Sequence, residues 1–163
     1  MATNPPPDLT LSSITGRSRS VRQWLTVFHL LFVAVDPAND RSAWIVPTAG
    51  RVLTGYGQAD CRVAWLVAGT PAEARRFLGR WAREVLTFAD PDLAAVRAFG
   101  LGSLPAIVHL GMDGSVVNAV EGWEPGEWRR LTSDLSRILR WSRPAIPLPS
   151  DPGPFSGAPL PAV

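Results

Sequence analysis

The chain has a single cysteine, Cys61, among its 163 residues. One cysteine cannot form an intramolecular disulfide, and it cannot build the zinc or iron–sulfur sites that need several cysteine ligands. The two histidines, His29 and His109, stand in apolar runs without further ligands at useful spacing. The sequence therefore predicts no metal site, and we expect no cofactor.

Lysine is absent, since all 16 basic residues are arginine, and the formal net charge is only +2. The arginines are scattered along the chain without interleaved aromatic residues. Nucleic-acid binding therefore has little electrostatic support, because it requires a concentrated basic surface. A Gly-rich phosphate loop and a Gly-x-Ser-x-Gly elbow are also missing, which removes the usual signatures of nucleotide-binding proteins and serine hydrolases.

No apolar run is long enough to cross a membrane. The run Leu25–Val35 has eleven residues, whereas a bilayer needs about 20. Three arginines precede it, as in a secretory signal, but it contains a histidine and is followed by Asp36-Pro37 instead of a small-residue cleavage site. We expect a cytoplasmic protein without a membrane span.

Hydrophobic residues make up 46% of the chain, enough for the core of one domain. Proline gathers at the two ends. Pro5-Pro6-Pro7 indicates a loose N-terminal arm, 1–18, and seven of the 16 prolines lie in 143–163. We therefore divide the chain into this arm, a folded domain at 19–142, and a Pro-rich tail at 143–163 that is extended or polyproline-like.

Strand-like and helix-like segments alternate within the domain. Thr70, Pro71 and Glu73 form a capping box with proline at the first helical position, and Asp113-Gly114 is a hairpin turn. Strands alternating with helices give a parallel sheet, and the late hairpin makes the sheet mixed. The expected strands are 30–35, 62–68, 85–88, 106–110 and 116–120, and the expected helices are 19–28, 42–53, 71–84, 90–99 and 125–141.

The segment 90–117, DPDLAAVRAFGLGSLPAIVHLGMDGSVV, resembles the second half of thioredoxin-like domains, particularly the TlpA-like and alkyl hydroperoxide reductase/thiol-specific antioxidant branch. In that pattern an Asp-Pro turn leads a short helix, a hydrophobic residue precedes a cis-proline, and a strand, an Asp-Gly turn and a strand follow. Pro105 falls at the cis-proline position, and Pro47 matches the kink proline of an earlier helix. The resemblance covers roughly residues 20–140 and implies an α/β thioredoxin-like fold, a central mixed sheet flanked by helices.

The chain departs from this pattern where the redox chemistry of the relatives resides. Placing Pro47 on the kink proline puts Asn39-Asp40-Arg41-Ser42 at the position of the Cys-x-x-Cys pair. A carboxamide or a hydroxyl cannot replace a thiolate in disulfide exchange. The peroxidatic cysteine of the antioxidant relatives would lie in the same loop and is also missing. We therefore assign no catalytic residue, and the sequence favours a protein that is not an enzyme.

Thioredoxin-like domains hold extended peptide beside the cis-proline through the backbone of the preceding residue, which does not require cysteine. The resemblance therefore implies a redox-inactive accessory or chaperone-like module that binds a protein partner, alone or in a larger complex. The tail would be a second contact. The candidate contact residues are Asn39, Asp40, Arg41, Ser42, Trp44, Ser103, Leu104, Pro105 and Trp123.

Two alternatives stay open. Cys61 could serve a one-cysteine thiol-dependent peroxidase or oxidoreductase, although it precedes the strand 62–68, away from the active-site loop, and has no nearby base in sequence, so we favour a structural role. A small-molecule site in the same cleft is the third hypothesis. Among the other motifs, we expect Asp90 and Asp92 to cap a helix and the tryptophans of 121–128 to pack over the sheet edge.

Overall fold

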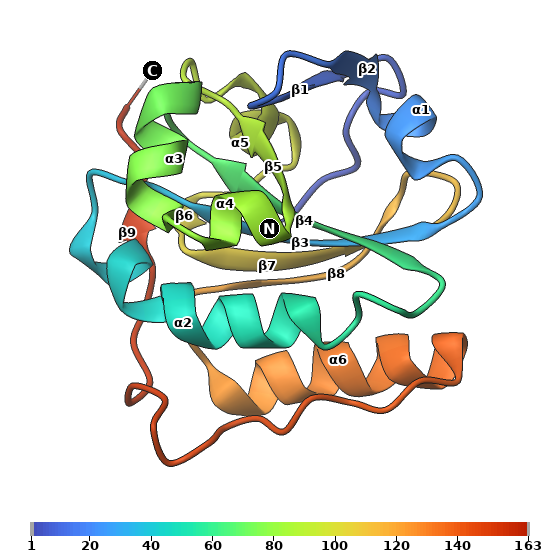
Figure 1. Cartoon of the computed structure of the whole chain (residues 1–163), viewed down its shortest axis with the longest axis vertical. Helices are drawn as coiled ribbons and strands as arrows, with labels where there is room; N and C mark the ends of the chain where they lie inside the picture. The colour runs from blue at the N-terminus through green and yellow to red at the C-terminus, as the bar shows by residue number, and fades with distance from the viewer. Residues whose placement is uncertain (1, 163) are drawn as a thin grey trace.

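The computed structural model describes residues 2–162, which form a central seven-stranded sheet of order β2-β1-β5-β4-β3-β7-β8 covered by helices on both faces (Figure 1). A separate two-stranded pairing joins β6 to β9. The strands are β1 (Thr10–Ser13), β2 (Ser18–Ser20), β3 (His29–Val35), β4 (Cys61–Val67), β5 (Leu86–Ala89), β6 (Ser103–Leu104), β7 (Ala106–Leu110), β8 (Val116–Glu121) and β9 (Ala158–Pro159). The helices are α1 (Val21–Leu25), α2 (Asp40–Thr54), α3 (Pro71–Leu78), α4 (Trp81–Glu84), α5 (Ala94–Ala98) and α6 (Pro125–Leu139).

The central strand β3 determines how the core is divided. It pairs in parallel with β4 and antiparallel with β7, so the expected mixed sheet is confirmed. Its sequence HLLFVAV is almost wholly apolar because both of its faces are covered. From residue 30 to 35, the odd-numbered side chains pack with α2, α3 and α6, and the even-numbered ones pack with α1 and α5.

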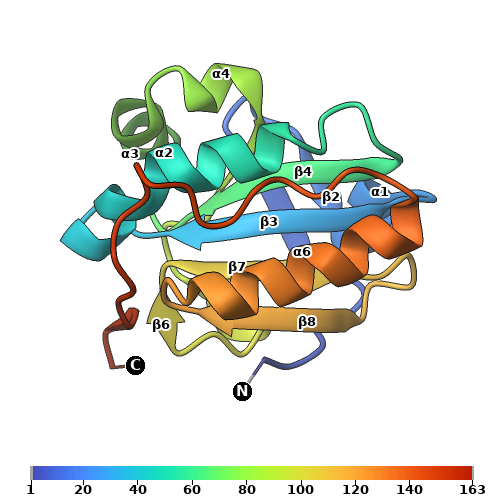
Figure 2. The same cartoon turned by 90° about the horizontal axis from the view of Figure 1, so that it is seen from below.

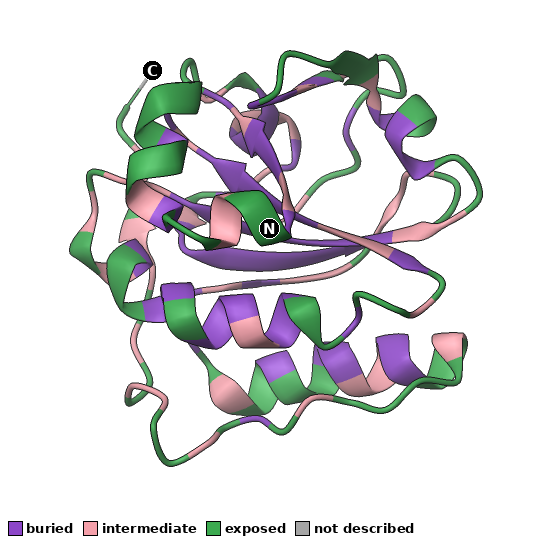
Figure 3. Ribbon diagram, in the orientation of Figure 1, coloured by how far each residue is buried: buried purple, intermediate pink, exposed green. Residues whose placement is uncertain are grey.

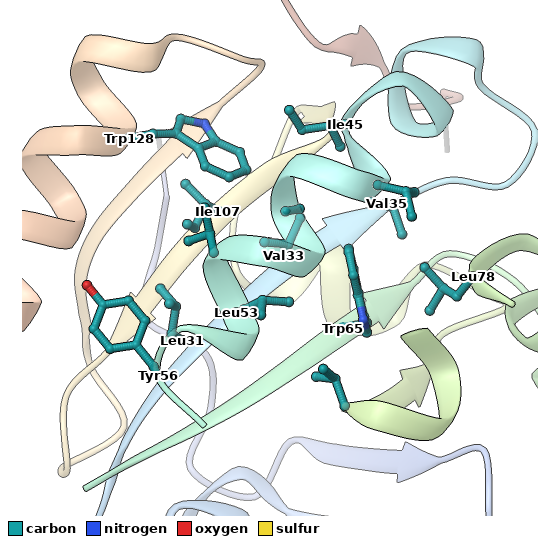
Figure 4. Packing of buried hydrophobic residues seen from close by; sticks show 14 of the residues in the cluster. Leu31, Val33, Val35, Ile45, Leu53, Tyr56, Trp65, Leu78, Ile107 and Trp128 are labelled. Carbon is teal, nitrogen blue, oxygen red and sulfur yellow. The ribbon is translucent and has the colours of Figure 1, made fainter. Parts of the chain in front are cut away.

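The face beneath α2 and α6 holds the largest buried side chains (Figure 4). Trp65 and Trp128 are fully buried there. Tyr56 is buried as well, and its hydroxyl donates to the Thr132 carbonyl at 3.0 Å and is 2.7 Å from the hydroxyl of Ser136 on α6. Figure 3 shows the opposite sides of these helices facing solvent. The buried sides of these helices therefore join them to the sheet.

Several expected segments differ from the structure. The expected helix 19–28 is shorter, since Ser18–Ser20 is β2 and α1 ends at Leu25. The arm 1–18 is not loose throughout, because β1 pairs antiparallel with β5 and Leu11 is buried. The expected helix 71–84 is two helices, since Gly79 has a φ of +57° and ends α3 with its N–H donating to the Arg75 carbonyl. Glycine adopts this left-handed backbone without the steric cost that a side chain brings.

Several local motifs are confirmed. Thr70 and Glu73 form the expected capping box, and the β7–β8 hairpin surrounds Asp113-Gly114. Asp90 caps α5, because its two carboxylate oxygens accept the N–H groups of Ala95 and Val96 at 3.0 and 2.8 Å. Burial raises the pKa of this carboxyl, which its backbone hydrogen bonds partly offset.

The tail folds back over its own domain. Figure 2 shows it running from the end of α6 along α2 and α6 to β6. Residues 143–162 form no helix, and Ala158–Pro159 forms β9. Within residues 2–162, no helix combines the length and the apolar character needed to cross a bilayer. The apolar run tested as a secretory signal contributes β3, the middle of the core.

Candidate functional site

The site predicted from the sequence lies at the carboxyl end of β3. Ala34, next to last in β3, pairs with Ala106 at the start of β7. This pairing places the loop that follows β3 beside the turn that precedes β7. In that turn the Leu104–Pro105 peptide is cis, as the position in the sequence pattern predicts.

The four residues expected to form a loop, 39–42, are instead the N-cap and first turn of α2. Asn39 is the N-cap of α2, with its Oδ1 accepting the Ser42 N–H at 3.0 Å. Its Nδ2 donates to the Leu104 carbonyl at 3.2 Å. The Ser42 hydroxyl is buried and accepts the Asp36 N–H at 2.9 Å. Both side chains are therefore committed to main-chain hydrogen bonds.

Arg41 turns towards the tail. Its guanidinium donates to the Ser156 and Gly157 carbonyls at 3.1 and 3.0 Å and to the Ser156 hydroxyl at 3.3 Å. Asp40 is exposed on the first turn of α2, where the helix dipole favours an acidic group. The first turn of α2 thus directs the Arg41 side chain onto tail residues 115 or more positions away in the sequence.

The tail adds a short strand to the turn before Pro105. In this antiparallel pair Leu104 lies opposite Ala158 and Ser103 opposite Pro159. The Leu160 N–H extends it by donating to the Gly102 carbonyl at 3.0 Å. The Leu104 side chain is fully buried in the core, so only its backbone is available for binding.

The sequence analysis missed a carboxylate behind this turn. Glu121 accepts the Ser103 hydroxyl at 2.7 Å and the Gly102 N–H at 3.2 Å. These two bonds hold the backbone of β6 in place beside the tail. Nothing in the sequence pattern distinguishes Glu121 from an ordinary residue at a strand end.

Two glycines allow the backbones to approach closely. A Cβ at Gly157 would lie 2.5 Å from the Ser103 hydroxyl oxygen and 2.9 Å from its Cβ. A Cβ at Gly122, where φ is +79°, would lie 2.8 Å from both the Phe155 carbonyl oxygen and the Gly157 nitrogen. Such separations are far below van der Waals contact. Both positions therefore need glycine for the tail to lie where it does.

The two candidate tryptophans have different surroundings. Trp44 is 55% exposed and makes an edge-to-face contact with Phe155, with ring centroids 5.4 Å apart. Trp123 is fully buried. Its backbone exchanges hydrogen bonds of 2.7 and 3.0 Å with Phe155, and its indole N–H donates to the Pro152 carbonyl at 2.7 Å. With the tail docked, Trp123 is therefore covered, and its direct contact with a partner stays a prediction.

Asp151 anchors the start of the docked segment. Its carboxylate is 4% exposed and accepts from the Thr48 hydroxyl at 2.7 Å, the Arg51 guanidinium at 2.8 Å and the Leu148 N–H at 2.6 Å. The sequence analysis did not select this residue. A signal was available, because Asp151 is the only charged side chain after Arg143.

Cys61 lies at the other end of the sheet. It pairs with His29 at the first position of β3, five residues before Ala34 and thus roughly 17 Å from the Pro105 end. The thiol is buried, and this burial raises its pKa to about 12. A thiol in this state is protonated at neutral pH and has no access to a ligand beside Pro105.

The two histidines also lie at that end. The Nδ1 of His29 is 2.9 Å from the Nε2 of His109, so one ring donates to the other. Burial, with a smaller effect of His29, lowers the pKa of His109 to about 4. Among residues 2–162, no three metal-ligating side chains of the His, Cys, Asp and Glu types gather into one group.

Comparison with known proteins identifies the fold. No protein-family model and no curated protein matches the sequence. The chain is similar to a solved structure assigned as the thiol:disulfide interchange protein DsbE from Chlorobium tepidum, with a TM-score of 0.70, 17% identity, and coverage of 85% of this chain and 98% of that one. The thioredoxin domain of a thiol-disulfide oxidoreductase from Bacteroides vulgatus gives a TM-score of 0.63 at 12% identity, covering 85% and 99%. A hypothetical protein from Sinorhizobium meliloti 1021 gives 0.70 at 10% identity, covering 98% and 93%.

Proposed function

Because the chain has the thioredoxin-like fold, we propose that it is a redox-inactive accessory or chaperone-like module that binds an extended segment of a protein partner at the turn 103–105. The observation that carries the proposal concerns residues 39–42, which stand at the position of the dithiol pair in the family pattern. Asn39 and Arg41 there donate hydrogen bonds to main-chain carbonyls of the turn and of an extended segment. A helix start of this kind holds peptide backbone without exchanging sulfur.

The competing thiol hypothesis has little support from the surroundings of Cys61. Peroxide reduction and disulfide exchange both start from an accessible thiolate. Burial and a pKa of about 12 oppose both requirements. The nearest histidine, His29, already shares a hydrogen bond with His109.

A small-molecule site in the same cleft is also disfavoured, because the contact seen at β6 is antiparallel strand pairing, which an extended peptide can make and a small molecule cannot. We keep the cytoplasm as the proposed compartment on the grounds given by the sequence.

Site-directed photo-crosslinking in the native host tests the binding function. A photoreactive amino acid replaces Trp44, which is exposed and contacts Phe155 of the tail, in the full-length chain. We expect it to capture one defined protein far more efficiently than the same group does at a control position. The matched control carries the same group at Val117, which is 50% exposed on β8. Equal capture at both positions, or no capture at position 44, would contradict the proposal. The purified chain should also leave the rate of insulin reduction by dithiothreitol unchanged.

A further inference from the structure

The segment from Asp151 to Leu160 crosses the candidate site and is held by contacts with α2, with β6 and with Trp123. We propose that Phe155–Pro159 is the resident ligand of this site, and that the partner segment which displaces it has the same chemistry. That segment is extended and uncharged, with an aromatic residue followed two positions later by glycine and then by Ala-Pro. This inference rests on the proposed binding function and specifies its ligand.

The tail adds a strand, β9, to the edge of the domain at β6. β9 extends the edge formed by Ser103 and Leu104, where main-chain groups supply the contact and any extended peptide in the same register can replace it. Glu121 fixes this edge from behind through Ser103 and the Gly102 N–H. The edge is therefore held in place by the domain and does not depend on the tail for its shape.

The segment has a glycine, Gly157, two positions after its aromatic residue, Phe155, and the close packing there requires it. The space at Gly157 is closed by Ser103, and the space at Gly122 is closed by the tail backbone. The domain thus contributes a glycine that admits the segment, and the segment contributes a glycine that admits the domain. A ligand with a side chain at the position of Gly157 collides with Ser103.

The backbone of the segment binds Arg41, and its Phe155 side chain binds Trp44. Arg41 donates to two carbonyls and a hydroxyl of the segment, so its charge is satisfied without a carboxylate. Trp44 meets the ring of Phe155 edge to face, a preferred aromatic geometry. Residues 152–162 carry no charge at all. An uncharged segment with one aromatic anchor is therefore the ligand that this surface fits.

Because the tail is tethered, it competes strongly with any partner. A segment on a short tether has an effective concentration on the order of 1 mM at its own site. A partner segment of equal intrinsic affinity therefore binds poorly while the tail is docked. It binds well once the tail has left the site. Releasing the tail without removing it exposes the site for measurement.

The experiment uses the full-length chain and a fluorescent peptide of residues 151–162. Gly157→Val in the protein should release its tail through the clash with Ser103, and the peptide should then bind at least tenfold more tightly than to wild type. Gly153→Val is the matched control, since a Cβ at Gly153 meets nothing within 4 Å, and it should behave as wild type. A peptide carrying Phe155→Ala should bind about tenfold more weakly, and one carrying Gly157→Val should not bind.

A second measurement needs no variant and remains valid if the Gly157→Val chain folds poorly. Excess unlabelled peptide added to wild type should accelerate hydrogen exchange at the Phe155 amide of the resident tail, which bonds to Trp123. Equal peptide affinity for wild type and the Gly157→Val chain, or no effect on this exchange, would overturn the inference. A wild-type dimer with exchanged tails would also overturn it.

Failure of this inference can be distinguished from failure of the proposed function. If position 44 captures a partner that the peptide does not displace, the chain binds proteins but the ligand chemistry is wrong. If the peptide binds as expected and no partner is captured, the ligand chemistry is right and the binding function fails.

Discussion

The two ends of β3 carry opposite kinds of chemistry. At the carboxyl end, Asn39 and Arg41 form hydrogen bonds with main-chain groups. At the amino end lie the thiol of Cys61 and the imidazoles of His29 and His109, and Cys61 and His109 are buried. The chain therefore retains a thiol, but at the wrong end of the strand and in a form that resists ionisation.

The two ends also differ in what covers them. The tail lies over the carboxyl end and buries Trp123 completely. The amino end leaves Val27, Met112 and Ile138 exposed. The difference teaches that a cysteine count alone does not decide redox function, because position and solvation decide whether a thiol can react.

Labelling of Cys61 should give the largest effect. With a pKa of about 12, the thiol has a thiolate fraction at pH 8 on the order of 10³ lower than that of an unperturbed thiol. We expect native protein to react with a thiol-specific disulfide reagent at least that much more slowly than protein unfolded in guanidinium chloride. Rapid reaction of the native chain would break the comparison and restore the peroxidase alternative.

Placing two cysteines at the carboxyl end of β3 should sharpen the comparison between the two ends of this strand. In an Asn39→Cys/Ser42→Cys chain with Cys61→Ala, the two thiols lie at the N-terminus of α2, where the helix dipole lowers a thiol pKa. We expect a disulfide between them, and reaction of the reduced pair about 10³-fold faster than that of native Cys61. Mass spectrometry and labelling kinetics measure both. The Cys61→Ala chain is the control, and failure to form the disulfide would contradict the placement of residues 39–42.

Local patterns explain how much of the fold could be predicted. The capping box at Thr70, the turn at Asp113-Gly114 and the apolar run of β3 are each specified by neighbouring residues, and each is confirmed. Gly79 was misjudged because the helical pattern of apolar residues continues past it. The strand β1 was missed because it is short and mostly polar, and its partner β5 lies more than 70 residues away.

The candidate site shows the same limit more clearly. The family pattern located Asn39, Arg41, Ser103 and Pro105 together, and the structure brings them together. It could not locate the tail, since the contacts of Phe155 with Trp44 and Trp123 join distant parts of the chain and no local rule determines them. The sequence did predict that Trp123 packs over the sheet edge, but it could not show that the tail completes this burial.

The histidine pair predicts how acid affects the amino end. Unfolded protein takes up a proton at His109 near the ordinary pKa of 6.5, whereas the folded protein does so only near pH 4. Acid therefore favours unfolding between these values, and His109 should account for the loss of up to about 3 kcal/mol of folding free energy. Urea unfolding at pH 7 and pH 4.5 measures this loss. His109→Leu should reduce the dependence of the unfolding free energy on pH. If this free energy changes equally with pH in the wild-type and His109→Leu proteins, His109 is not the group responsible.

Asp151 should give the smallest effect, confined to the carboxyl end. In Asp151→Asn the side chain keeps one oxygen but directs an NH2 group at a donor, because Thr48, Arg51 and the Leu148 N–H all donate to the carboxylate. Breaking this mostly buried pair should cost about 1–3 kcal/mol of tail docking. Hydrogen exchange at the Phe155 amide should become roughly ten- to a hundredfold faster, while exchange in β3 stays unchanged. Asp134→Asn is the control, because its ion pair with Arg137 is exposed and should contribute little. If both variants leave the tail equally protected, strand pairing and the glycine contacts hold it without Asp151.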